Sequence, residues 1–173
     1  MTDSAKPKLI YLVTEDWYFY SHRLPMARAA QRAGFDVAVI TNVKDHRNKI
    51  EQENIRVIPL SLERRNLNPL QAVKHIAQLV QIYKQERPTV VHHIAMKPVL
   101  YGAIAAWLAN VPHVINAFAG LGFVFTAQSA LAKILRMVLI PTFHVLLKRP
   151  NSVLLLQNPD DREVLDDEDI TPR

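Results

Sequence analysis

Short apolar runs alternate with helix-like segments along the whole chain, and this alternation limits the fold more than any other feature. Leu9–Thr14, Phe35–Thr41 and Thr89–Ile94 are largely apolar at successive positions, which is typical of parallel strands buried on both faces. The segments between them carry helix signals. Asn68 and Pro69, for example, supply an N-cap followed by proline at the first helical position. The pattern predicts a parallel sheet with helices on both faces, joined by right-handed crossovers.

The predicted elements follow one another in a regular order. Strands are expected at residues 9–14, 35–41, 55–60, 89–94, 114–117 and 152–156. Helices are expected at residues 21–33, 69–87, 97–109 and 129–148, and from residue 158 onward, with residues 44–53 forming a polar connection. The chain has 173 residues, enough for one well-formed domain and too few for two. We therefore expect residues 1–173 to form a single Rossmann-like, doubly wound α/β domain with a parallel sheet of about six strands.

Composition excludes several classes of protein. The chain has no cysteine, so disulfide scaffolds, thiolate zinc sites and cysteine nucleophiles are excluded, and a cytoplasmic protein is expected. The first residues, MTDSAKPK, lack the apolar core of a signal peptide, and no run reaches the ~18 apolar residues that span a bilayer. The net charge of +5 favours anionic partners such as phosphorylated ligands or acidic lipid, although solvated surface lysines explain it equally well.

Candidate catalytic residues follow the first and fourth expected strands, because ligands in such sheets bind beyond the carboxyl ends of the strands. Glu15 and Asp16 are candidates for a general base; the alternative is a solvated loop pair or a helix cap. His92 and His93 are neighbours on a strand, so they point to opposite faces and cannot chelate a metal together. We expect one of them to pack under a helix and the other, His93, to face the rim of the sheet as a candidate catalytic residue. No metal site is predicted.

Further candidates follow the fourth and fifth strands. Lys97 precedes Pro98 at an expected helix N-terminus, where backbone N–H groups attract phosphate; the alternative is an exposed lysine before a helix. Asn116 lies near the end of the fifth strand. Gly120 and Gly122 either allow close backbone approach to a ligand or simply turn the chain. The run GLGFVF is not a dinucleotide fingerprint, and no Walker A pattern is present.

The helix expected at residues 129–148 carries basic residues on an otherwise apolar surface. At 100° per residue they form one stripe: Lys133, Arg136, His144 and Lys148. Such a stripe suits peripheral contact with an anionic membrane surface, and it equally suits a mostly buried helix with one basic, solvated face.

Three stretches resemble the N-terminal half of a retaining glycosyltransferase of family 4, which has the GT-B fold. They are KLIYLVTEDWYFYSHRLPMARAAQRAGFDVAVIT at residues 8–41, HHIAMKPVLYGAIAAWLANVPHVINAFAGLGFVF at 92–125 and VLLLQNPDDREVL at 153–165. Together they cover nearly the whole chain in the right order. The most similar subset comprises bacterial hexosyl- or N-acetylhexosaminyltransferases that extend lipid-linked oligosaccharide or exopolysaccharide precursors, including lipopolysaccharide.

The resemblance implies an acceptor-binding domain for a lipid-linked or oligosaccharide acceptor, peripheral at the cytoplasmic face of the inner membrane. In the family a C-terminal domain binds the nucleotide sugar through a Glu-x7-Glu motif, and here no two glutamates stand eight positions apart. We therefore expect the UDP-sugar donor to bind a C-terminal domain or partner chain, with no cofactor on this chain and no activity of the chain alone. The resemblance assigns acceptor binding to His22, Arg23, Lys97, Gly120 and Gly122, with Asn116 as a further strand-end candidate; Ala119 occupies the slot of the family's usual histidine.

Other readings remain open. The chain is expected to be a fragment, a truncated gene product or half of a split enzyme, and a non-catalytic membrane-recruiting subunit is one alternative. A nucleotide-binding Rossmann protein unrelated to sugars is another, although bulky Trp17, Tyr18 and Phe19 stand where a phosphate fingerprint would follow the first strand. Nucleic acid is not an expected partner, because the basic residues are scattered rather than gathered on one element.

Overall fold

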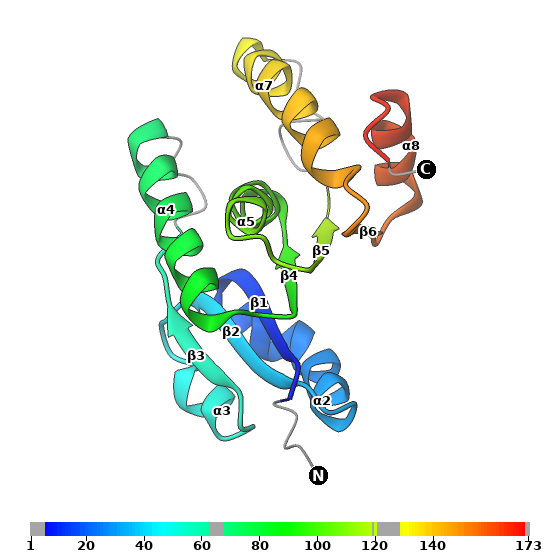
Figure 1. Ribbon diagram of the computed structural model, residues 1–173. Helices are drawn as coiled ribbons and strands as arrows, with labels where there is room; N and C mark the ends of the chain where they lie inside the picture. Colours follow the sequence, from blue (N-terminus) through cyan, green and yellow to red (C-terminus); the bar gives the residue numbers. More distant parts are fainter. Residues whose placement is uncertain (1–5, 63–67, 119, 121–128, 172–173) are drawn as a thin grey trace.

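The computed structural model describes residues 6–62, 68–118, 120 and 129–171. Its centre is a parallel sheet of six strands in the order β3-β2-β1-β4-β5-β6 (Figure 1). The strands are β1 (Lys8–Glu15), β2 (Asp36–Asn42), β3 (Arg56–Pro59), β4 (Val90–Ile94), β5 (His113–Phe118) and β6 (Ser152–Leu156). The predicted Rossmann-like, doubly wound α/β fold is confirmed.

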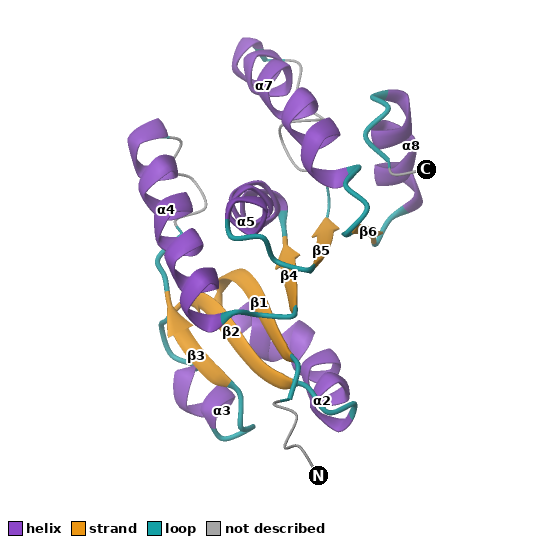
Figure 2. Ribbon diagram, viewed as in Figure 1, coloured by secondary structure: helices purple, strands orange, loops and turns teal. Residues whose placement is uncertain are grey.

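Helices cover both faces of this sheet (Figure 2). They are α1 (Asp16–Tyr18), the π-helical turn η1 (Phe19–Arg23), α2 (Leu24–Arg32), α3 (Arg47–Glu51), α4 (Pro69–Glu86), α5 (Met96–Leu108), α7 (Ala130–Leu147) and α8 (Pro159–Asp167). The predicted Asn68 cap is present, because its side-chain oxygen accepts a hydrogen bond from the Leu70 amide at 2.9 Å.

The larger helices pack on one face of the sheet. Helices α4 and α5 bury Leu79, Tyr83 and Ala105 against Ile10 and Leu12 of β1. Helices α7 and α8 extend this layer past β5, where Phe118 meets Phe143 with ring centroids 5.6 Å apart. This layer is continuous because every connection from β3 onward crosses on the same side.

The opposite face is covered over β1, β2 and β3 by η1, α2 and α3. Tyr11 and Phe19 meet there edge to face, with ring centroids 5.4 Å apart. Farther along this face Val153 and Leu155 of β6 are 55% and 41% exposed. They point away from Leu154 and Leu156, which join the α7 layer, because successive strand residues alternate between faces. Within the described part of the chain, the outer face of β6 is therefore uncovered.

Two local expectations were wrong. The first helix, expected to begin at Ser21, begins at Asp16, directly after β1, and continues through η1 into α2. Pro25 has no amide hydrogen for a regular helical bond there, and the Leu24 amide bonds to the Phe19 carbonyl five residues back, which is the π-helical pattern. Residues 44–53, expected as a polar connection, contain the short helix α3.

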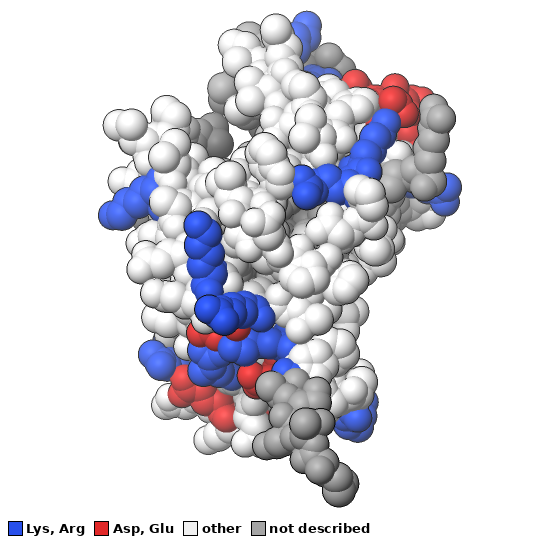
Figure 3. Space-filling model, viewed as in Figure 1, with Lys and Arg blue, Asp and Glu red and all other residues white. Residues whose placement is uncertain are grey.

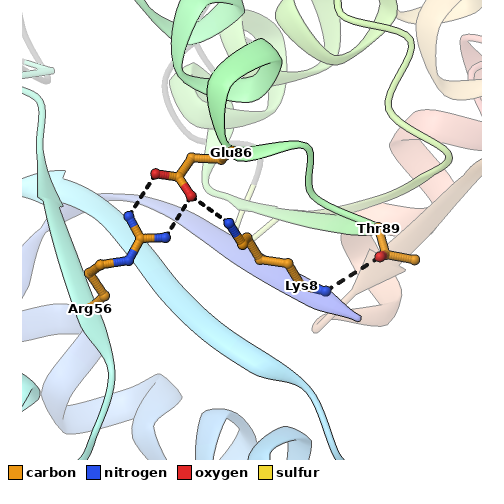
Figure 4. A network of polar contacts seen from close by, with 4 residues as sticks. All are labelled: Lys8, Arg56, Glu86 and Thr89. Carbon is orange, nitrogen blue, oxygen red and sulfur yellow. Dashed lines mark hydrogen bonds and ion pairs between the residues drawn. The ribbon is translucent and has the colours of Figure 1, made fainter. Parts of the chain in front are cut away.

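The amino ends of the strands are joined by a charged network (Figure 4). Glu86 at the end of α4 accepts two hydrogen bonds of 2.6 Å from Arg56 and one of 2.7 Å from Lys8 Nζ. The Lys8 amide donates to Thr89 Oγ1 at 3.3 Å. A hollow of about 320 Å³ lies at this end of the sheet, away from the rim considered below.

Among the residues that the structure describes, no helix is both long and apolar enough to cross a bilayer.

Candidate functional site

The candidate site lies at the carboxyl edge of the sheet, where the segments after the strands meet. β1 pairs with β2 on one side and with β4 on the other, so the strand order reverses beside β1. Open α/β sheets bind their ligands at such a reversal point. The segments that reach this edge are α1 and η1 after β1, the start of α5 after β4, and residues 157–158 after β6.

Aromatic rings dominate the segment after β1. The ring of Tyr18 stacks on the ring of His22, with centroids 4.7 Å apart and an angle of 12° between the planes. Trp17 contacts both rings edge to face, and Ser21 Oγ lies 2.7 Å from His22 Nδ1. Trp17 is 44% exposed and His22 is exposed. This aromatic cluster (Trp17, Tyr18 and His22) gives the rim a rigid surface with an apolar face and polar edges.

Arg23 closes the same segment and is buried, with only 8% of its surface exposed. Its Nη2 donates to the Tyr18 hydroxyl at 3.0 Å, and its guanidinium carbon lies 5.6 Å from the centroid of the Tyr18 ring. In the amide orientation that satisfies both groups, the Gln157 oxygen accepts from both Nη atoms, at 3.1 Å from Nη1. Arg23 thereby joins the segment after β1 to the end of β6.

Asp16, a candidate general base, has a structural role instead. Its carboxylate is fully buried and accepts three backbone hydrogen bonds, from Trp17 at 2.7 Å, Lys44 at 2.7 Å and His46 at 3.0 Å. Burial acts to raise the pKa of Asp16, but these bonds and the nearby His46 outweigh it and lower the pKa. A buried carboxylate with its oxygens engaged cannot reach a ligand. Asp16 is neither solvated nor the N-cap of the following helix, which is Glu15; its carboxylate instead holds the loop after β2.

Glu15, the other candidate base, ends β1 and forms an ion pair with Lys44, whose Nζ lies 3.0 Å from Glu15 Oε2. Its side chain is 15% exposed. Glu15 and Asp16 together hold the loop that follows β2 against the segment after β1. Of the two candidate carboxylates, only Glu15 retains access to solvent.

The two histidines of β4 point to opposite faces, as predicted, but the expectation that His93 faces the rim is wrong. His93 is fully buried beneath α5. Its ring lies 3.1 Å from the Tyr83 hydroxyl and 2.8 Å from the Asn116 side-chain oxygen, and Asn116 Nδ2 donates to Ser152 Oγ at 3.0 Å. The network is built because His93 and Asn116 are register partners on β4 and β5 and share a face.

This buried network also corrects the expectation for Asn116. Its side chain has no exposed surface and both of its polar atoms are engaged within the core, so it does not meet an acceptor at the rim. Burial lowers the pKa of His93 to about 4, against the opposing effect of its bond with Asn116, so its ring is neutral near pH 7. Burial likewise raises the pKa of Tyr83.

His92 lies on the other face, beside the segment after β1. It is 2% exposed, and its ring centroid is 5.1 Å from that of Tyr11. Burial, with the charges of His93 and Arg23, lowers the pKa of His92 to about 4. Its Nε2 has no hydrogen-bond partner among the described residues. Of the two histidines, His92 is the one on the Arg23 side of the sheet.

The remaining rim candidates are placed differently from one another. Lys97 is half-buried near the start of α5, with its Nζ 5.6 Å from the centroid of the Tyr101 ring one turn along the helix. Ala95, the N-cap residue of α5, has φ 81° and ψ 160°, a strained conformation that non-glycine residues rarely adopt. Gly120 is exposed with φ 99°. Gly122 and Ala119 lie outside the described residues.

The four basic residues of the expected stripe, three in α7 and Lys148 directly after it, do not form one exposed stripe. Lys148 forms an ion pair with Asp169 at 2.8 Å, and the His144 ring lies 2.9 Å from the Glu168 carbonyl oxygen, so both face the turn after α8. Arg136 is half-buried, and Lys133 is exposed. The exposed surface of α7 is instead largely apolar, and Figure 3 shows mainly uncharged atoms over this helix. Among its described side chains, the most exposed apolar ones are Ile134, Met137, Val138 and Val145.

Sequence reasoning missed the partners that organise the rim. Gln157 carries no sequence signal beyond its place after the last predicted strand, and Trp17 and Tyr18 stand out only as bulky residues. Strand alternation separates the two histidines, but it does not say which face each one meets, so His92 was passed over. The exposed aromatics after a buried strand were the available signal for this site. In the described ranges, no three His, Cys, Asp or Glu side chains gather as metal ligands.

Comparison with known proteins gives both sequence and structural relatives. An N,N'-diacetylbacillosaminyl-diphospho-undecaprenol alpha-1,3-N-acetylgalactosaminyltransferase of Campylobacter jejuni is 26% identical over 120 residues, which is 69% of this chain and 32% of that protein. The chain thus spans about a third of the length of this relative.

Two solved structures share the fold at low sequence identity. Anabaena HepE, solved with UDP and glucose, has a TM-score of 0.63 and 13% identity, over 94% of this chain and 41% of its own. A glycosyltransferase of Rickettsia africae has a TM-score of 0.60 and 13% identity, over 98% of this chain and 51% of its own. The chain therefore has the fold of one Rossmann-like half of the GT-B architecture.

A family model matches a longer stretch of the chain than the Campylobacter relative does. The model described as glycosyl transferase 4-like covers residues 8–156, from the first strand to the last. The resemblance noted from the sequence is confirmed: this chain belongs to the glycosyl transferase 4-like family.

Proposed function

We propose that this chain is the acceptor-binding half of a sugar transferase that uses a nucleotide-sugar donor. The observation that carries the proposal is the aromatic cluster of Trp17, Tyr18 and His22, exposed at the reversal point of the sheet. Flat aromatic faces pack against the apolar faces of sugar rings, while the polar edges of the same residues are placed to meet hydroxyl groups. A nucleotide-binding Rossmann protein needs a glycine-rich turn at this position instead.

The acceptor that we propose is a sugar linked through phosphate to a lipid. The Campylobacter relative is named for an acceptor of that kind, a diphospho-undecaprenol. His22 and Arg23 would contact this acceptor, with Lys97, Gly120 and Gly122 on the neighbouring rim segments. Glu15 is the remaining candidate for a general base, because it ends β1 within the same rim and keeps access to solvent.

Transfer requires the donor to be brought to the acceptor, and we propose that a second domain or partner chain binds the UDP-sugar and closes over this rim. Catalysis would then depend on positioning, since a bound acceptor and a separately bound donor react only when they are aligned. The chain alone is accordingly expected to show no transfer from UDP-sugars.

We further propose that α7 rests on the cytoplasmic face of the membrane that carries the acceptor. Ile134, Met137 and Val138 are 60%, 77% and 62% exposed on neighbouring turns, with Lys133 exposed beside them. An exposed apolar face with a nearby cation is the arrangement by which a helix lies in an anionic membrane surface. This assigns membrane contact to the apolar side of α7 rather than to His144 and Lys148.

The fluorescence of Trp17 tests acceptor binding directly. In a Trp107→Phe background Trp17 is the only tryptophan, and it lies in the proposed contact surface. A polyprenyl-diphosphate-linked amino sugar in detergent micelles is expected to change its emission saturably, and His22→Ala is expected to weaken the response. Saturable binding that is equally strong in the His22→Ala variant, or no binding at all, would overturn the proposed acceptor surface.

A further inference from the structure

Arg23 is a buried cation whose described partners are all neutral. It is only 8% exposed, and it donates to the Tyr18 hydroxyl and to the Gln157 side-chain oxygen. No described aspartate or glutamate forms an ion pair with it, whereas other arginines such as Arg28 and Arg56 have carboxylate partners. A buried charge is costly unless it is paired, and none of these partners carries a negative charge.

Two side-chain nitrogens on the Arg23 side of the sheet have no hydrogen-bond partner among the described residues. A guanidinium carries five N–H donors, and Arg23 Nε has no hydrogen-bond partner in the described part of the chain. His92 Nε2 likewise has no hydrogen-bond partner there. The charge of Arg23 acts to lower the pKa of both His92 and Tyr11, whose ring centroids lie 5.1 Å apart. Two unengaged nitrogens, one cationic and one on a neutral ring, therefore lie on the face from which the segment after β1 approaches the sheet.

The position of Arg23 is that of a ligand-binding group. It follows β1 at the reversal point of the sheet and reaches the end of β6 through Gln157. Gln157 also lines a groove of about 770 Å³ that runs along β6 and the start of α8, with Val153 and Arg162 among its lining residues. A ligand in this groove comes against the residue that holds the guanidinium.

We propose that Arg23 is the anchor of a phosphoryl-binding subsite, held in place by Tyr18 and Gln157 and completed by His92. While the Nη atoms stay bonded to Tyr18 and Gln157, the Arg23 Nε–H is left to donate to one phosphoryl oxygen, and a second oxygen is available to His92 Nε2 when that nitrogen carries the ring proton. The subsite rests on the proposed function only for the origin of the phosphoryl group. That group is part of a phosphate ester, either of a lipid-linked acceptor or of a nucleotide donor.

Gln157→Glu provides the sharpest test because it changes one atom. The new carboxylate supplies the missing counter-ion from within the protein, so the variant is expected to fold with an unchanged or higher melting temperature. It is also expected to lose pyrophosphate binding by about tenfold or more, since the guanidinium is already paired. Arg23→Gln removes the charge and Arg23→Lys keeps the charge but removes the Nε–H donor, and both are expected to weaken binding as well. Arg32→Gln removes one exposed charge at the end of α2 and serves as the matched control.

Isothermal titration calorimetry of the 173-residue chain with pyrophosphate measures the effect, with geranyl diphosphate and UDP as further ligands. Binding by the wild type and Arg32→Gln that is lost in Gln157→Glu supports the subsite. Tighter binding of geranyl diphosphate identifies an acceptor phosphoryl, and tighter binding of UDP identifies a donor phosphoryl. The absence of pyrophosphate binding to the wild type, or equal binding by Gln157→Glu and wild type, would refute it. If the chain binds pyrophosphate through Arg23 but binds no sugar acceptor, the subsite stands and only the proposed function is refuted.

Discussion

Gly102 of α5 lies directly against the imidazole ring of His93 on β4. A Cβ added at Gly102 would stand 2.5 Å from His93 Cδ2, closer than real contacts allow. Gly102→Ala is therefore expected to lower the free energy of unfolding by about 1–3 kcal/mol, the usual cost of overpacking a core. This exceeds the ~0.5–1 kcal/mol that alanine gains over glycine within a helix. Urea denaturation followed by circular dichroism measures the difference.

His93, the residue that the added Cβ would meet, provides the control. In a His93→Ala background the ring is gone, so Gly102→Ala is expected to cost little or to stabilise the fold, giving a strong coupling in the double-mutant cycle. Additive effects of the two substitutions would show that the close approach of α5 to His93 does not exist in solution.

Acid sensitivity is expected from the network of Glu86 with Arg56 and Lys8. Hydrogen bonding to Arg56, helped by Lys8 and opposed by burial, lowers the pKa of Glu86 to about 2 from an ordinary value of 4.5. The stabilisation is then fully present above pH ~4.5 and is lost as the pH falls from ~4.5 towards ~2. Glu86→Gln is expected to cost about 1 kcal/mol at pH 7 and to flatten the loss of stability below pH 4.5. Glu51→Gln, in the exposed pair with Arg47, is the control with a smaller expected effect.

Asp16 is expected to stabilise the protein by accepting hydrogen bonds from the backbone of the loop after β2. In Asp16→Ala both acceptor oxygens are gone, so the backbone N–H groups of Lys44 and His46, which share Oδ2, lose their partner at a cost of about 1–3 kcal/mol. Hydrogen exchange of these two amides, followed by NMR, is expected to accelerate. Glu15→Gln is the control, expected to change stability by less than ~1 kcal/mol because its partner is an exposed lysine. Unchanged exchange in Asp16→Ala would contradict the structural role.

Membrane contact through α7 can be tested by separating its two sides. Met137→Glu places a charge on the apolar exposed side and is expected to reduce binding to vesicles of anionic phospholipid severalfold. Lys148→Glu alters a residue that is paired with Asp169 and is expected to have a smaller effect. Co-sedimentation with vesicles at low and high salt measures both. A larger loss of vesicle binding in Lys148→Glu than in Met137→Glu would show that the basic stripe contacts the membrane instead.

The fold was predictable because its signals are local. Buried parallel strands are apolar at successive positions, and the Asn68 cap and Pro69 fix the start of α4 within one residue. The start of the first helix was not predictable, because it depends on the carboxylate of Asp16 meeting amides about 30 residues away.

The site was less predictable than the fold, for the same physical reason. The rim position of the segment after β1 followed from the strand pattern, but the partners of its residues did not. The roles of His93 and Asn116 depend on the register between β4 and β5, which places the two side chains in contact beneath α5. The pairing of Arg23 with Gln157 joins residues at opposite ends of the chain, and no local pattern encodes it.

The central claim is that this chain holds the acceptor while a separate domain or chain holds the donor. It is tested most directly by measuring, in one titration series, the affinity of the chain for a polyprenyl-diphosphate-linked sugar and for a UDP-sugar, with turnover assayed in the mixture. We predict saturable binding of the lipid-linked sugar, weakened severalfold by Trp17→Ala, at least tenfold weaker binding of the UDP-sugar and no sugar transfer. Tighter binding of the UDP-sugar than of the lipid-linked sugar, or measurable turnover by the chain alone, would contradict the account.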